Sequence, residues 1–136
     1  MRRLTLAFFF LAAVSAGPAS AQSDADDIRA VISGQIEAFR ADDFARAFTY
    51  ASPAIRRMFG NPARFGQMVR DGYPMVWRPA DVRFSGLSED GGRTVQSVLM
   101  TDGDGVPFVV DYEMIAEEDG WRINGVRVRR TGAAGT

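Results

Sequence analysis

The chain has 136 residues, and its positive charge comes from arginine alone, because it contains no lysine, histidine or cysteine. Lysine, histidine and cysteine are the side chains that act as nucleophiles or change protonation state most readily near pH 7. Reactions that depend on one of these three side chains are therefore excluded. The net charge of −1 also argues against nucleic acid as a partner, because phosphate binding requires a strongly basic surface.

Residues 1–21 have the pattern of a secretory signal peptide. Two arginines precede an apolar run from Leu4 to Val14, and small residues at 19–21 predict cleavage after Ala21. We therefore expect a periplasmic or secreted protein. The run is shorter than the roughly 20 apolar residues of a membrane span, so no membrane association is expected after cleavage. Without the two leader arginines, 14 arginines face 17 acidic residues, a net charge of −3.

The first half of the remaining chain has helical periodicity. Ser23 and Asp26 resemble a capping box, which predicts a helix that begins there and ends near Arg40. Its apolar residues recur at helical spacing, at positions 28, 32, 36 and 39. A second helix is predicted over 44–51, with Asp42 or Asp43 as its cap.

Two shorter helices are indicated by their end signals. Ser52-Pro53 opens one that Gly60 closes, and Asn61-Pro62 opens another that Gly72 closes. A capping residue before a first-turn proline is typical of helix starts, and glycine is typical of helix ends. Tyr73 and Trp77 follow and are expected on a loop.

The second half alternates with a period of two. Strands are predicted over 82–88, 93–101, 106–117 and 120–130, with glycine-rich turns between them. Asp-Gly turns between alternating runs indicate hairpins, so we expect an antiparallel meander. The chain is thus predicted to form one α+β domain over 22–130, followed by a disordered tail at 131–136.

The last hairpin is predicted in more detail. With its turn at Asp119-Gly120, the large apolar residues share one face only if a bulge is inserted at Asn124-Gly125. In this register Val126 lies opposite Met114, and Val128 lies opposite Tyr112.

The same register determines the opposite face of the hairpin. It predicts ion pairs of Asp111 with Arg129 and of Glu113 with Arg127. A catalytic carboxylate pair or half a metal site is the alternative for the two acids. We predict no metal: Asp102, Asp104 and Glu113 have the spacing of positions 1, 3 and 12 of a calcium loop, but Val106 and Pro107 stand at positions 5 and 6, where a ligand and a glycine are needed.

The order of elements resembles the nuclear transport factor 2-like superfamily, also called ketosteroid-isomerase-like or cystatin-like. Within it, the chain is similar to a bacterial exported family of unknown function. The resemblance covers residues 24–130. It is carried by the stretches 35–39, 42–48, 50–53, 72–74 and 119–123, and by Phe65, Met68 and Val69.

The resemblance implies that the N-terminal helices pack on the concave face of a curved four-stranded sheet, leaving a cone-shaped pocket. Tyr50, Tyr73, Trp77 and Tyr112 are the candidates to line it, since each has an apolar body and a polar tip. Steroid-isomerising members of the superfamily use an aspartate base with a tyrosine and a protonated acid. This chain departs from that pattern, because its expected concave face has no carboxylate on the last two strands.

Three functions are compatible with these features. The first is a non-catalytic module that binds a small apolar or aromatic molecule, without cofactor or catalytic residues. The second is a structural or homodimerisation module whose cone is filled by its own side chains. The third is an isomerase- or dehydratase-like enzyme that uses a carboxylate and a tyrosine.

Overall fold

A computed structural model describes residues 17–131, so most of the predicted leader and tail lie outside the described part of the chain. Helices come first and strands second, which confirms the predicted α+β class. None of the helices within this part combines the length and apolarity needed to cross a membrane. The elements are α1 (Gly17–Arg40), α2 (Phe44–Thr49), α3 (Pro53–Phe59), α4 (Pro62–Gly72), α5 (Pro74–Trp77), β1 (Asp81–Asp90), β2 (Arg93–Thr101), β3 (Pro107–Glu117) and β4 (Gly120–Arg130).

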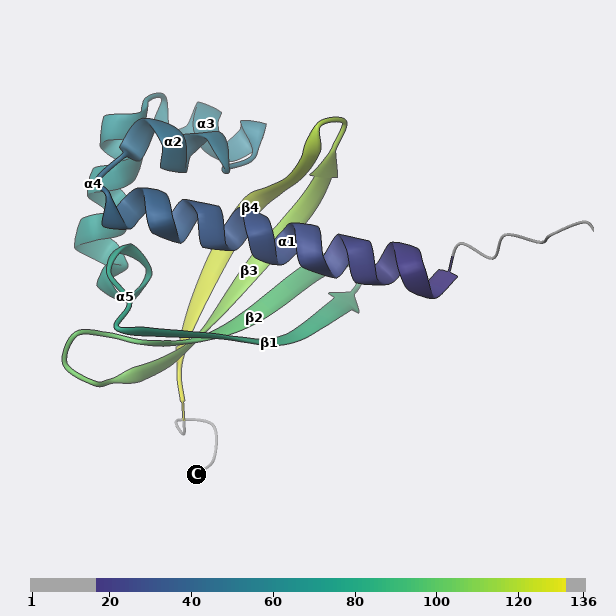
Figure 1. Cartoon of the computed structure of the whole chain (residues 1–136). Helices are drawn as coiled ribbons and strands as arrows, with labels where there is room; N and C mark the ends of the chain where they lie inside the picture. The colour runs from purple at the N-terminus through teal and green to yellow at the C-terminus, as the bar shows by residue number, and fades with distance from the viewer. Residues whose placement is uncertain (1–16, 132–136) are drawn as a thin grey trace, which may run out of the picture.

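The four strands form an antiparallel sheet in the order β1-β2-β3-β4. Helix α1 lies across one face of this twisted sheet, and the other four helices gather at the C-terminal end of α1 (Figure 1). Alternate residues of the central strands face α1 and are buried, as their period of two predicts. The core between helix and sheet includes Ile28, Ile32, Phe39, Val98, Met100, Val110 and Tyr112, all of them fully buried.

Helix α1 begins earlier than its sequence signals predict. It starts at Gly17, so Ser23 lies inside the helix, and the expected capping box is wrong. The stretch 19–22 contains two alanines, the best helix former, and so continues the helix upstream of Ser23.

The shorter helices begin where their signals predict, and α3 and α4 also end there, whereas α2 ends at Thr49 instead of the predicted position 51. The side chain of Asp43 caps α2, Ser52 caps α3 and Asn61 caps α4, each by accepting a backbone N–H three residues later. Gly60 closes α3 with a φ of 82°, a conformation that favours glycine. The expected loop at Tyr73 and Trp77 is wrong in part, because Pro74 starts the short helix α5 that includes Trp77.

The β3–β4 hairpin contains the predicted bulge but not the predicted register. Its turn is Glu118-Asp119, so Trp121 lies opposite Ala116, and beyond the extra residue Asn124 the strands pair Val126 with Tyr112. The predicted pairs Val126–Met114 and Val128–Tyr112 are wrong by two residues. A slip of two residues keeps every side chain on its face, so the apolar and charged faces are as predicted.

The bulge is also where the helices are joined to the sheet. Residues 50–52 run parallel to β4, with Ser52 N–H donating to the Ile123 carbonyl at 2.8 Å and Ile123 N–H to the Tyr50 carbonyl at 2.9 Å. The hydroxyl of Ser52, which is fully buried, donates to Asn124 Oδ1 at 2.8 Å and accepts from Ile55 N–H at 3.2 Å. One serine thus caps α3 and holds it to β4.

We expect Ser52→Ala to lower the free energy of unfolding by about 2–3 kcal/mol, because it removes a cap and leaves Asn124 Oδ1 without its donor. Asn61→Ala, which removes only an exposed cap, serves as the control and is expected to cost about 1 kcal/mol. Urea denaturation measures both. Equal losses in the two variants would show that the bond to Asn124 contributes nothing.

Candidate functional site

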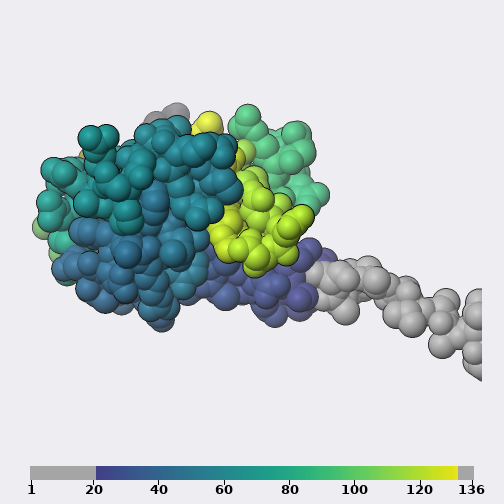
Figure 2. All heavy atoms as spheres, turned by 90° about the horizontal axis from the view of Figure 1, so that it is seen from above, coloured from purple at the N-terminus to yellow at the C-terminus, as the bar shows by residue number. Residues whose placement is uncertain are grey.

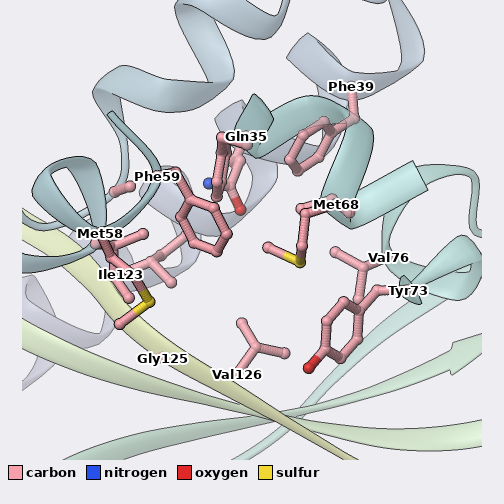
Figure 3. Close-up of a pocket in the computed structure, with 14 residues that line it drawn as sticks. Gln35, Phe39, Met58, Phe59, Met68, Tyr73, Val76, Ile123, Gly125 and Val126 are labelled. Atoms are coloured by element: carbon pink, nitrogen blue, oxygen red, sulfur yellow. The ribbon is translucent and has the colours of Figure 1, made fainter. Parts of the chain in front are cut away.

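A pocket of about 270 Å³ lies between the helical end of the molecule and the sheet. Side chains from α1, α3, α4 and β4 surround it and point into the space that they enclose (Figure 3). None of the lining residues is charged. They are Gln35, Phe39, Ala51, Ile55, Met58, Phe59, Phe65, Met68, Val69, Tyr73, Val76, Ile123, Gly125 and Val126.

Helical spacing explains the upper wall of this pocket. Residues 55, 58 and 59 of α3 and residues 65, 68 and 69 of α4 each follow the pattern i, i+3, i+4, which places them on one side of their helix. The prolines at the helix starts and the Gly60 end fix where each helix begins and turns. The phenyl rings of Phe59 and Phe65 pack edge to face with centroids 5.7 Å apart, and this contact joins α3 to α4.

The bulge in β4 builds the floor of the pocket. Ile123 and Val126 both face the helices although they are three positions apart, because Asn124 is the extra residue between the two halves of the strand. Gly125 contributes only backbone to the floor, since a Cβ at this position would meet Glu113 Oε2 on the outer face of the sheet. The pocket is therefore bounded below by the feature that also anchors α3.

Two polar side chains line the pocket. Gln35 is 3% exposed, and its Nε2 donates to the Ala47 carbonyl at 3.1 Å. With its amide nitrogen held in this way, the Oε1 atom is directed toward the pocket, and the Tyr73 hydroxyl points inward from another wall (Figure 3). The lining thus offers one hydrogen-bond acceptor and one phenol within an otherwise apolar surface.

The structure brings only one of the four sequence-predicted binding residues to this pocket. Tyr73 lines it, whereas Tyr50, Trp77 and Tyr112 do not. The ring of Tyr50 packs against Gly34 of α1, and its hydroxyl accepts from Arg46 at 3.4 Å.

Trp77 is part of the helical layer rather than of the pocket. The guanidinium of Arg78 lies 4.3 Å from its ring centroid, and its indole Nε1 is buried without a partner among the described residues. This tryptophan therefore serves packing and a cation–π contact.

Tyr112 lies deep beneath α1. It is fully buried, and its hydroxyl has no partner within residues 17–131; the same holds for Oε1 of Gln96, directly opposite on β2. Burial raises the pKa of Tyr112 well above its ordinary value, because the low-dielectric interior disfavours the phenolate.

The outer face of the sheet carries the charged residues. Arg129 Nε donates to Asp111 Oδ2 at 2.9 Å, diagonally across the ladder, since Asp111 faces Arg127 directly. The predicted pair of Glu113 with Arg127 is wrong, because the two-residue register difference leaves Glu113 opposite Gly125, and Glu113 Oε1 instead lies 3.5 Å from Arg93 Nε.

Burial and hydrogen bonding change the pKa of Asp111 in opposite directions. Its burial by itself would raise the pKa, but hydrogen bonds from Arg129 and from the Ser97 hydroxyl, at 2.7 Å, outweigh burial and lower it. A polar depression of about 470 Å³ extends over this face. In the part of the chain that the structure describes, no cluster of three or more acidic side chains could hold a metal ion.

Sequence reasoning missed most of the pocket wall. Gln35 gave one usable signal, a polar residue on the buried face of an otherwise apolar helix, next to Ile36 and one turn from Ile32 and Phe39. Met58 gave none, because an exposed methionine on a short helix has no distinctive pattern.

The described part of the chain is a small α+β domain. Its helices cover one face of a curved antiparallel sheet, and an uncharged pocket lies between helices and sheet. More specifically, the chain belongs to the family described as Domain of unknown function (DUF4864), which it matches over residues 21–136. No curated protein and no solved structure matches the chain.

Alkaline pH should reveal the burial of Tyr112. Above about pH 10 an unfolded tyrosine loses its proton while the buried one keeps it, so stability falls by up to about 1.4 kcal/mol per pH unit. We expect Tyr112→Phe to reduce this fall, as measured by urea denaturation from pH 8 to pH 11. Tyr50→Phe, which removes a surface phenol, is the control; an equal effect of both variants would contradict the assignment.

Proposed function

We propose that the domain is a non-catalytic module that binds a small apolar or aromatic molecule in the pocket between α1, α3, α4 and β4. The observation that carries the proposal is the composition of the lining: fourteen residues without a charge, among them three phenylalanines and two methionines. Ligand pockets are characteristically apolar with a few placed polar groups, and here these are Gln35 and Tyr73.

The size of the pocket limits what it holds. A volume of 270 Å³ is near the lower end of the range for ligand pockets. At about 30 Å³ for each water-sized unit it corresponds to on the order of ten non-hydrogen atoms. A single substituted ring or a medium-length alkyl chain fits this limit, whereas a molecule the size of a steroid would extend outside.

The alternatives receive less support from the same features. A cone filled by its own side chains would leave no such pocket. An enzyme with a carboxylate and a phenol would need the two within hydrogen-bond reach, but among the described residues Tyr112 has no partner and Tyr50 accepts from an arginine. The outer sheet face, with three arginines and three acids around its depression, is compatible with a homodimer.

We further propose membership in the nuclear transport factor 2-like superfamily and export to the periplasm. Helices packed on a curved four-stranded meander support the first. The family match begins at residue 21, next to the predicted cleavage point after Ala21, and this supports the second.

Filling the pocket should abolish binding. We expect Val126→Phe, which adds a ring at the pocket floor, to lose any small molecule that the wild-type protein retains on purification from the periplasm, as measured by native mass spectrometry. The same variant should lose the rise in melting temperature that octan-1-ol or indole gives the wild type. Val109→Phe makes the same change on the opposite sheet face and should retain both. Unchanged binding by Val126→Phe would refute the assignment.

A further inference from the structure

Charge is distributed unevenly between the two ends of the molecule. Helices α2–α5 with their connections, residues 44–80, have six arginines and a single acid, Asp71, and the adjoining residues 37–43 add Arg40 and three acids. Residues 21–43 and 81–131 together have eight arginines and sixteen acids. An acidic protein therefore has one basic end, which Figure 2 shows in blue and teal, with the β3–β4 turn in yellow-green beside it.

Four of the six arginines have no carboxylate partner in residues 17–131, and three of these four also lack a side-chain hydrogen bond there. Arg78 pairs with Asp42 at 2.7 Å, Arg70 lies 3.6 Å from Asp71, and Arg46 contacts the Tyr50 hydroxyl. The other three, Arg56, Arg57 and Arg64, are exposed and have no carboxylate within 4.0 Å in the described part of the chain.

The pocket opens at this basic end. Met58 lines the pocket and is nevertheless 71% exposed, so the opening lies beside it on α3. Arg56 and Arg57 precede Met58 on the same short helix and are exposed, on sides of α3 other than the one that lines the pocket. The short helix that borders the opening thus carries two exposed arginines without a carboxylate partner, whose long side chains extend from its outer surface.

We propose that the pocket binds the alkyl chain of a small anionic amphiphile, whose carboxylate or phosphate head group stays at the opening beside Arg56 and Arg57. This inference rests on the proposed function and names its ligand class. The head group remains outside because no cationic side chain lines the pocket, and an unpaired anion buried there would carry a large desolvation penalty. At the opening it lies in the field of arginines that no acid neutralises.

Three matched probes test this inference by isothermal titration calorimetry: octanoate, octan-1-ol and octylammonium. Each has about the number of non-hydrogen atoms that the pocket accommodates. We expect octanoate to bind about fivefold more tightly than octan-1-ol, the size of effect that exposed charges produce, and octylammonium to bind most weakly. The preference for octanoate should disappear near 1 M salt, where the screening length is only about 3 Å.

The double variant Arg56→Gln/Arg57→Gln should weaken octanoate about fivefold and leave octan-1-ol unchanged. Arg83→Gln/Arg127→Gln removes the same charge from exposed positions on the sheet and should alter neither probe. Equal affinity of octanoate and octan-1-ol, or equal effects of both variants, would overturn this inference while the proposed function stands. Binding of none of the probes, together with binding of no indole, would overturn the proposed function itself.

Discussion

The bond network between residues 50–52 and the bulge of β4 determines where the helical end lies relative to the sheet. Two backbone hydrogen bonds and the buried Ser52 hydroxyl hold this junction. Each partner depends on the other, because Asn124 reaches Ser52 only as the extra residue of the bulge, and Ser52 begins α3 only where it is held. The pocket is the space that remains between elements positioned in this way.

That space remains uncharged because the charged groups of the surrounding elements are directed elsewhere. The Gln35 amide nitrogen is bonded to the Ala47 carbonyl, and the acids of β3 lie on the opposite face of the sheet with their arginines. Successive residues of β3 therefore place apolar side chains on one face of the sheet and charged side chains on the other. The arginines of α3 and α4 remain outside because helical spacing directs the apolar residues inward.

Local signals in the sequence were sufficient for most of the fold. Capping residues before proline gave the starts of α3 and α4, and Asp-Gly turns with alternating residues gave four strands within one or two residues. The phase change after Ile123 was enough to predict the bulge. The register was wrong by two residues because such a slip leaves the apolar pattern unchanged, and only turn geometry distinguishes the two alignments. The pocket wall was not predictable, because a gap between helices depends on how far apart packing holds them. Tyr73 and Trp77, for example, lie at the two ends of one short apolar segment, yet only Tyr73 lines the pocket.

Helix α3 has no buried residue, although it forms part of the pocket wall. Its fixed points are the Ser52 cap at one end and Gly60 at the other, while Ile55, Met58 and Phe59 contact the pocket only with their side chains. Detaching α3 would expose mainly the half-buried side chains of Ile55 and Phe59 and their contacts in the pocket wall, so its opening costs less than unfolding of the whole domain. A local opening of α3 would therefore widen access to the pocket while the core beneath α1 stays folded.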